Sequence, residues 1–413
     1  MKIFVQFLEG GPDSARLPPR EARNLLRSAF GRLPIDNVLL GWNLPPALLE
    51  ACAVECDRQH AALYLWQPLL AGDGVFEPRP GWRTIGLNGI PVGDPKDRME
   101  FTFVCPNRVG VRDAVLDHLD DVLAGGFFQG VFLDRIRFPS PAENPGRNLA
   151  CFCEDCRRAA ESAGVDLAFA QNHLALLLQT PEGKRAAVRS FLSAPRRPPQ
   201  PCDDWLERLL AFRCRSIAAF VADAAGLARA RGLKVGLDCF SPTLARMVGQ
   251  DLAELAAHCD WIKGMTYIRA YGPASIPFEL LGLTDWIRAS DQQDESQILA
   301  FLADAAEWDL PPHREVIRRE GLPSTVLAEE IGRGRDACTR PFLAGIELVE
   351  MPGVAALDPE RIRADLEALH AAAADGIVLS WDLRFIPAAR LEMVNGLFSR
   401  RHRPGEARKG LMN

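Results

Sequence analysis

Residues 130–138 read GVFLDRIRF, a short apolar run that ends in charged residues. A run of this kind is typical of a strand buried on both faces of a parallel sheet. Eight such runs occur, at residues 3–8, 37–42, 61–67, 130–138, 234–240, 261–267, 344–350 and 376–382. Amphipathic helical patterns accompany them, at residues 19–30, 46–58, 112–124, 205–231, 251–258, 324–338, 359–374 and 388–398. The alternation predicts an α/β fold with a parallel sheet and right-handed crossovers.

Eight strand and helix units are the number that closes a (β/α)8 TIM barrel. The alternative is an open, doubly wound sheet, which would carry a Gly-rich phosphate loop after its first strand. The chain has Glu9-Gly10-Gly11-Pro12 there, which is not such a loop. We therefore predict a single catalytic barrel over residues 1–400, followed by a solvated tail at 401–413. Long loops follow strands 3, 4 and 6, at residues 68–108, 139–204 and 268–323.

Composition narrows the possible partners and compartments. The 413 residues carry a net charge of −6 and no basic stripe, so nucleic acid is not an expected partner. No apolar stretch approaches the roughly 18 residues that cross a membrane. The N-terminus lacks the pattern of a signal peptide, and the 11 cysteines without one indicate reduced thiols. We expect a cytoplasmic protein and leave a homo-oligomer open.

Polar and aromatic residues cluster where the predicted strands end. In a barrel these ends share one face, which is where barrel enzymes assemble their sites. Aromatic rings stack on the apolar faces of sugars, and carboxylates and amides bind sugar hydroxyls. The combination predicts a carbohydrate site, with substrate contacts from Glu9, Trp42, Asn43, Trp66, Gln67, Arg137, Tyr267, Trp381 and Asp382.

Cleavage of a glycosidic bond normally requires two carboxyl groups. Asp134 is the first candidate, because it ends an apolar strand just before two arginines. In the alternative, Asp134 only pairs with Arg137 and caps the barrel.

The second carboxyl group is less clearly marked. Glu350 lies closer to the C-terminal end of the seventh strand than Glu347, which is roughly 10 Å deeper at ~3.3 Å per residue and of opposite side-chain parity. Depth favours Glu350 as the catalytic group and a buried ion pair for Glu347. Asp238 and Asp382 are further alternatives.

Three cysteines, Cys151, Cys153 and Cys156, form a C-x-C-x-x-C pattern in the loop after the fourth strand. With Cys105 from the preceding loop they match a tetrahedral, structural Zn²⁺ site. The spacing differs from that of radical iron–sulfur enzymes. A metal-dependent amidohydrolase would need histidines at strand ends, and the seven histidines fall on helices or loops.

Several segments resemble known families. GVFLDRIRFPS resembles the fourth-strand motif, similar to LDYIRYP, of several barrel families assigned as glycoside hydrolases. MVGQDLAELAAHCDWIKGMTY and AAAADGIVLSWDL resemble their fifth-to-sixth segment and their last strand. The pairing of VCPN with CFCEDC resembles the zinc-binding β-galactosidases, although those carry Asn-Glu where this chain has Leu133-Asp134. Together these segments span about residues 100 to 385.

The resemblance implies that Asp134, Tyr267 and Trp381 line the cleft and that the four cysteines bind zinc. With the strand-end residues, it predicts a glycoside hydrolase that acts on an oligosaccharide or glycoconjugate. The alternative is a barrel that binds carbohydrate without cleaving it. A hydrolase should place two carboxyl groups about 5–5.5 Å apart if it retains the anomeric configuration, or about 6.5–9.5 Å apart if it inverts it.

Overall fold

The computed structural model describes residues 1–72, 79–93, 101–142, 144–192, 204–289, 294–355 and 357–399. Eight parallel strands pair in sequence order, and β8 pairs with β1 to close the barrel. The predicted fold class is therefore confirmed. The predicted tail at 401–413 lies outside the described residues. The strands are β1 (Lys2–Phe7), β2 (Asn37–Leu40), β3 (Ala62–Pro68), β4 (Gly130–Asp134), β5 (Lys234–Phe240), β6 (Trp261–Met265), β7 (Phe342–Glu347) and β8 (Gly376–Ser380).

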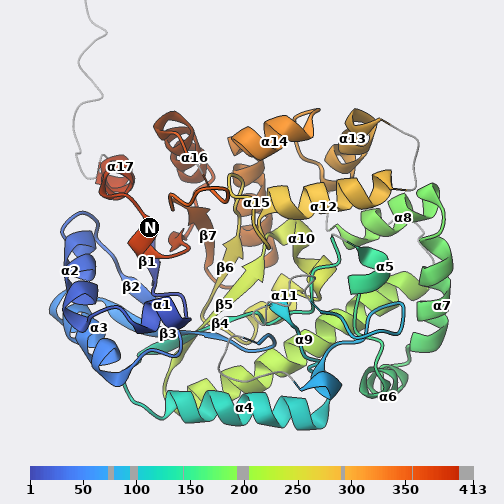
Figure 1. Ribbon diagram of the computed structural model, residues 1–413, viewed down its shortest axis with the longest axis horizontal. Helices are drawn as coiled ribbons and strands as arrows, with labels where there is room; N and C mark the ends of the chain where they lie inside the picture. Colours follow the sequence, from blue (N-terminus) through green and yellow to red (C-terminus); the bar gives the residue numbers. More distant parts are fainter. Residues whose placement is uncertain are drawn as a thin grey trace, which may run out of the picture.

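Helices surround the strands, and the longest, α9, runs alongside α4 (Figure 1). Along the chain, α5 to α8 come between β4 and α9, and α12 to α14 come between β6 and α15. The helices are α1 (Pro12–Ala15), α2 (Pro19–Phe30), α3 (Pro46–Arg58), α4 (Val109–Leu123), α5 (Pro145–Asn148), α6 (Glu154–Ser162), α7 (Leu167–Leu177), α8 (Pro181–Phe191), α9 (Asp204–Ala230), α10 (Pro242–Ala245), α11 (Leu252–Ala256), α12 (Ile276–Arg288), α13 (Glu295–Ala306), α14 (Arg314–Glu320), α15 (Ser324–Ala337), α16 (Pro359–Ala371) and α17 (Ala388–Ser399). Short 3-10 turns are η1 (Pro80–Trp82), η3 (Arg246–Val248) and η4 (Leu383–Phe385).

Local sequence explains where several helices begin. Asp251 precedes α11, and its carboxylate accepts hydrogen bonds from the backbone N–H groups of Ala253 and Glu254. Asp358 caps α16 in the same way, and Pro359 follows it at the first helical position. A carboxylate at this position satisfies donors that the helix leaves unpaired, and proline loses nothing there because its missing N–H would be unpaired.

The inside of the barrel is filled by side chains from alternate positions of the strands. We call this set the interior cluster: Phe4, Leu39, Trp42, Tyr64, Trp66, Phe132, Trp261, Leu343 and Val378. The ring of Phe132 stacks on Trp261 with centroids 5.2 Å apart, and Phe4 meets Trp261 edge-on at 4.9 Å. The interior is therefore a packed core and not a channel.

Two predicted sugar-stacking residues belong to this cluster. Trp42 and Trp66 are each only 3% exposed, and their rings meet edge-on at 5.2 Å. Gly10 and the guanidinium of Arg135 also lie against the ring of Trp42. Both indoles pack on protein groups, and the substrate-stacking role predicted for them stays a prediction.

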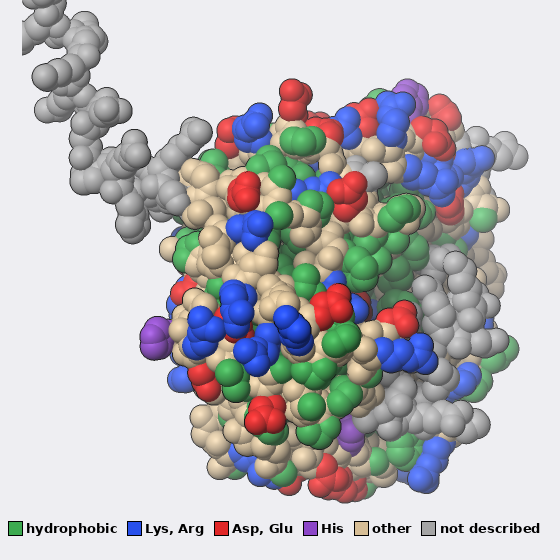
Figure 2. Space-filling model, turned by 60° about the vertical axis from the view of Figure 1, so that its left-hand side comes forward, with side chains coloured by type: hydrophobic (Ala, Val, Ile, Leu, Met, Phe, Trp, Pro, Cys, Tyr) green, Lys and Arg blue, Asp and Glu red, His purple; other side chains and the backbone are tan. Residues whose placement is uncertain are grey.

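The surface has one marked hollow in the view of Figure 2, bordered by hydrophobic side chains with acidic and basic ones nearby.

Among the described residues, no helix is both long enough and apolar enough to span a bilayer.

The packing of the interior cluster can be tested at Gly236. An added Cβ would lie 2.1 Å from an atom of the Trp261 ring, so Gly236→Ala should destabilise the protein by about 1–3 kcal/mol. The matched control is Gly226→Ala on α9, where the Cβ would meet nothing within 4 Å. That change should be neutral or stabilising by up to about 1 kcal/mol. Urea unfolding measures both variants; equal effects would contradict the described packing.

Candidate active site and metal centre

A polar layer lies above the interior cluster, toward the C-terminal ends of the strands. Its members are Gln6, Asp134, Asp238, Lys263 and Ser380, all buried. Side chains two residues apart on a strand share a face, so Asp134 faces inward like Phe132 and Lys263 faces inward like Trp261. We call this end of the barrel the mouth.

Hydrogen bonds join four members of the polar layer. The Lys263 ammonium donates to Asp238 Oδ2 and to Gln6 Oε1, each at 3.0 Å. The Ser380 hydroxyl also donates to Gln6 Oε1, at 2.6 Å. Side chains from β1, β5, β6 and β8 are thereby connected across the barrel.

Asp134 lies at the end of β4, as the sequence predicted, and its side chain is fixed by two donors. The Trp66 indole N–H donates to Oδ2 at 2.9 Å, and the backbone N–H of Arg135 donates to Oδ1 at 2.5 Å. Arg135 adopts a φ of 52°, in the left-handed region. The two hydrogen bonds hold the carboxylate in one orientation, and the residue is buried, with 8% of its surface exposed.

Asp238 is the neighbour of Asp134 on β5. Leu133 and Leu237 are partners in the β4–β5 register, so the two aspartates that follow them are side by side, on strands ~4.8 Å apart. Burial, with the nearby Asp134 charge, raises the pKa of Asp238 to about 7, although the Lys263 cation opposes this. Among the described residues, Asp238 Oδ1 has no hydrogen-bond partner.

The seventh strand ends earlier than the sequence predicted, and this changes the two glutamates. Glu347 is the last residue of β7 and shares the inward parity of Leu343. Its Oε1 accepts hydrogen bonds from the backbone N–H groups of Arg269 and of Ala270, the latter at 3.0 Å. Burial raises the pKa of Glu347 to about 8.

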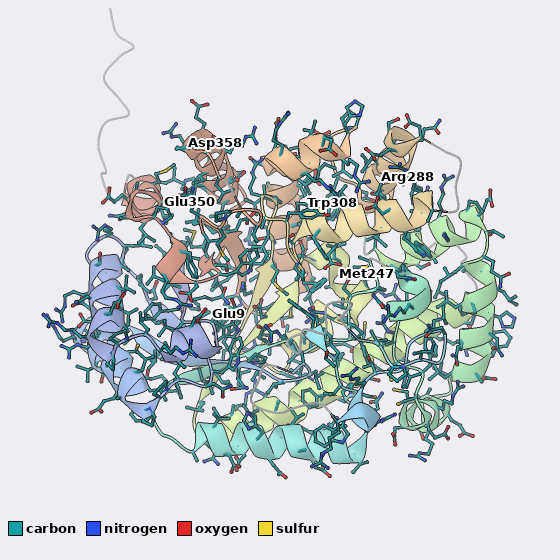
Figure 3. The ribbon with its side chains drawn as sticks, viewed as in Figure 1. Glu9, Met247, Arg288, Trp308, Glu350 and Asp358 are labelled. Atoms are coloured by element: carbon teal, nitrogen blue, oxygen red, sulfur yellow. The ribbon has the colours of Figure 1, made fainter. Side chains whose placement is uncertain are left out.

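Glu350 lies beyond the strand, and its position differs from the one expected of a catalytic group. Its side chain is 65% exposed and pairs with Arg390 at 3.3 Å. Figure 3 shows Glu350 apart from Glu9, which follows β1. The preference for Glu350 over Glu347 assumed a strand that reaches residue 350.

Other predicted contact residues are already engaged or face elsewhere. Asp382 caps η4 and accepts hydrogen bonds from the Arg384 guanidinium and from the backbone N–H of Glu9. Gln67 follows the inward-facing Trp66, so it points out of the barrel, where it is fully buried. Asn43 is exposed.

Tyr267 and Arg137, two of the predicted substrate contacts, are buried near the mouth. The ring of Tyr267 is fully buried and meets the half-buried Trp381 edge-on at 5.4 Å. The Arg137 guanidinium lies between the rings of Phe103 and Phe240, at 4.4 and 4.7 Å. Burial lowers the pKa of Arg137 to about 10, so it stays positively charged at neutral pH.

Sequence reasoning missed Lys263, Gln6 and Ser380. Each is a polar residue within an otherwise apolar strand, which is the available signal. A mid-strand lysine two residues beyond an inward tryptophan must place its amine inside the barrel. Gln6 and Lys263 lie before the predicted ends of their strands, and β8 ends at Ser380, two residues before the predicted end at Asp382.

The four predicted cysteine ligands meet in one buried cluster. The sulfurs of Cys105, Cys151, Cys153 and Cys156 all lie within 4.8 Å of one another. Cys105 Sγ is 3.6 Å from Cys153 Sγ and 3.4 Å from Cys156 Sγ. A tetrahedral ion with bonds of ~2.3 Å would separate its sulfurs by about 3.8 Å, so the cluster can hold a metal ion.

The surroundings of the cysteines suit thiolates. The backbone N–H of Ile85 donates to Cys151 Sγ at 3.3 Å, and the Asn107 amide donates to Cys156 Sγ at 3.3 Å. Donors of this kind stabilise negative charge on ligand sulfurs and orient them. Phe152 also donates to Ile85 O, so the cluster joins the loop after β3 to the loop after β4.

Comparisons with known proteins identify similar folds. No protein-family model matches the chain, and no curated protein matches it. Among solved structures, it is similar to the PgaB (BpsB) glycoside hydrolase domain of Bordetella bronchiseptica, with 11% identity, a TM-score of 0.51 and 97% of each chain covered. It is also similar to the β-galactosidase of Marinomonas ef1, with 11% identity and a TM-score of 0.56, over 97% of this chain and 60% of that one. The fold is thus one that glycoside hydrolases use.

The pKa of Glu347 predicts a pH dependence of stability. The folded carboxyl has a pKa of about 8 and the unfolded one about 4.5, so the folded protein binds the proton more tightly. The protonated Glu347 carboxyl therefore adds to the free energy of unfolding at acidic pH, and this contribution is lost as pH rises through about 8. Glu347→Gln keeps an oxygen for the two backbone donors and should lose less unfolding free energy between about pH 5 and pH 9 than wild type. Glu350→Gln is the control; an unchanged pH dependence in Glu347→Gln would contradict this assignment.

Proposed function

We propose that this protein hydrolyses a glycosidic bond in an oligosaccharide or glycoconjugate. The observation that carries the proposal is the pair of carboxyl groups, Asp134 and Asp238, placed side by side on adjacent strands and facing the mouth of the barrel. Glycoside hydrolysis normally uses two carboxyl groups that differ in protonation. The similarity of the fold to glycoside hydrolase structures is consistent with this reading.

The surroundings of the two carboxyl groups suggest their roles. Asp238, with a pKa of about 7, can carry a proton at neutral pH and deliver it to the leaving oxygen. Asp134, held by two N–H donors, is the carboxylate that faces the developing positive charge on the sugar. The distance between the two carboxyl groups distinguishes a retaining mechanism, at about 5–5.5 Å, from an inverting one, at about 6.5–9.5 Å.

Neighbouring groups support a sugar as the ligand. Trp381 is partly exposed and is fixed by Tyr267, so it offers an aromatic surface for the apolar face of a ring. Arg137 keeps a positive charge near both aspartates and is 5% exposed. We assign Trp381 to substrate contact, with the buried Tyr267 holding its ring and the buried Arg137 supplying positive charge behind the aspartates.

Replacing Asp134 with Asn tests the proposal. The change keeps the shape and removes the charge, so turnover should fall roughly 10²-fold or more while the melting temperature stays close to wild type. A screen of aryl glycosides supplies the substrate for the assay. The matched control is Glu350→Gln, which alters an exposed carboxylate beyond the strand and should keep wild-type activity.

Retention of more than about a tenth of the activity in Asp134→Asn would remove Asp134 from the mechanism. Binding of an oligosaccharide by the wild-type protein without any turnover would favour the carbohydrate-binding barrel instead.

We propose further that the four-cysteine cluster holds a structural Zn²⁺. Four thiolates in a closed, buried arrangement are the donor set of structural zinc sites. All four sulfur ligands come from the protein, so the site leaves no open position for substrate. When bound, the ion would fix the loops after β3 and β4 relative to each other.

Elemental analysis should find about one zinc per chain in protein purified without chelator. Cys153→Ser should lose most of this metal and lower the melting temperature, because metal binding stabilises the folded loops. The control is Cys52→Ser on α3, another buried cysteine, which should keep the zinc. Iron in place of zinc, or no metal at all, would contradict the assignment. Lost activity in Cys153→Ser at an unchanged melting temperature would indicate a catalytic metal.

A further inference from the structure

Lys263 occupies an unusual position for a lysine. It stands in the middle of β6, faces into the barrel and is fully buried. Lysine is almost never fully buried unless a partner compensates its charge. The partner is Asp238, its neighbour in the β5–β6 register, whose Oδ2 lies 3.0 Å from the ammonium.

The ammonium of Lys263 is held from several sides. Gln6 Oε1 accepts a second hydrogen bond from it, and Gln6 is itself fixed by the Ser380 hydroxyl. The rings of Phe132 and Tyr267 have their centroids 5.5 and 5.2 Å from the ammonium nitrogen, within the range of cation–π attraction. These contacts keep Lys263 charged and in one place.

The same contacts determine how Asp238 is presented. Oδ2 is bound by Lys263, whereas Oδ1 has no partner among the described residues. The carboxyl group therefore cannot rotate freely, and one oxygen remains for a ligand or a proton. The charge of Lys263 also opposes protonation of Asp238, which burial and a neighbouring carboxylate favour.

Other titratable or charged groups face this pair, and their effects differ in sign. Asp134 from β4 favours protonation of Asp238, and Arg137, which follows β4, opposes it. Tyr267 follows β6 and lies beside Lys263. Cys239 is the next residue on β5, and its thiol therefore lies on the opposite face of the strand from the pair. Of these groups, only Lys263 contacts the Asp238 carboxylate directly in the described structure.

We infer that Lys263 is a positioning residue that holds Asp238 by Oδ2 and so leaves Oδ1 for a ligand or a proton. The inference rests on the proposed function for its catalytic meaning. A lysine that only stabilised the barrel would, when replaced, lower the melting temperature and leave kcat at the pH optimum unchanged, because Asp238 would not depend on it for its orientation. This difference separates the two roles.

The variant Lys263→Met tests the inference, because methionine keeps an apolar stem and removes the ammonium. Kinetics are followed as kcat and KM against pH, on a glycoside that the wild-type enzyme cleaves. Without the cation Asp238 should hold its proton more tightly, so the alkaline limb of kcat/KM should move up by about one pH unit or more. The value of kcat should fall about tenfold or more with little change in KM, because a more weakly acidic group donates its proton less readily.

Two controls separate this effect from a general loss of stability. Lys184→Met removes another buried lysine, which binds the carbonyl of Trp286 between α8 and α12, and should leave the pH profile in place. Lys263→Arg keeps the charge and should leave the alkaline limb within about 0.5 unit of wild type. If Lys263→Met does not fold, Gln6→Glu replaces it. Its carboxylate shares the ammonium with Asp238 and should move the limb in the same direction.

A direct titration keeps the test independent of catalysis. Infrared or carbon NMR spectra of protein with labelled aspartate, assigned with Asp238→Asn, should show the pKa of Asp238 rising by about one unit or more in Lys263→Met. If the wild-type protein cleaves no glycoside but this rise is found, the proposed function fails while the direct contact between Lys263 and Asp238 stands. The inference is overturned if Lys263→Met folds and neither the alkaline limb of kcat/KM nor the pKa of Asp238 differs from wild type.

Discussion

Closure of the sheet is the constraint on which the rest of this structure depends. Once β8 pairs with β1, every second side chain of each strand must enter a space of fixed width. Near the N-terminal ends that space is filled by the rings of Phe4, Phe132 and Trp261. Two residues further along, the same faces bring Gln6, Asp134 and Lys263 together. The polar layer therefore follows from the alternation of side chains along each strand, because these residues are the next inward positions after the packed rings of the interior cluster.

The loops around the mouth are held by hydrogen bonds from buried side chains to backbone carbonyls, in addition to the hydrogen bonds between the strands. Arg213 on α9 is buried and donates to Ala150 O, next to the cysteine cluster, and to Met247 O in the loop after β5. The side chain of Gln250 donates to the carbonyl of Asp238 and so binds that loop to β5. The cysteine cluster and the proposed acid are thus connected through one short series of side chains, and distortion at the first would reach the second.

How far the sequence predicts this molecule depends on the range of the interactions involved. Strand and helix patterns are local, so the closed barrel and the end of β4 at Asp134 could be predicted. The cysteines could be predicted as well, because three lie within six residues and barrel order brings Cys105 beside them. Glu347 and Glu350 could not be distinguished, because the choice requires the last residue of β7. If the predicted end of β7 is wrong by three residues, the glutamate that is expected to face into the barrel is the wrong one of the two.

The pairing of Lys263 with Asp238 shows a different limit. Both residues are visible in the sequence, but the register of two strands and the burial of the pair are tertiary properties. A buried lysine without a partner is costly, and it is tolerated only when a carboxylate on the neighbouring strand compensates its charge. The same pairing that makes the lysine tolerable also sets the environment of Asp238. Stability and chemistry at the mouth are therefore coupled, and a substitution that removes this charge should alter both.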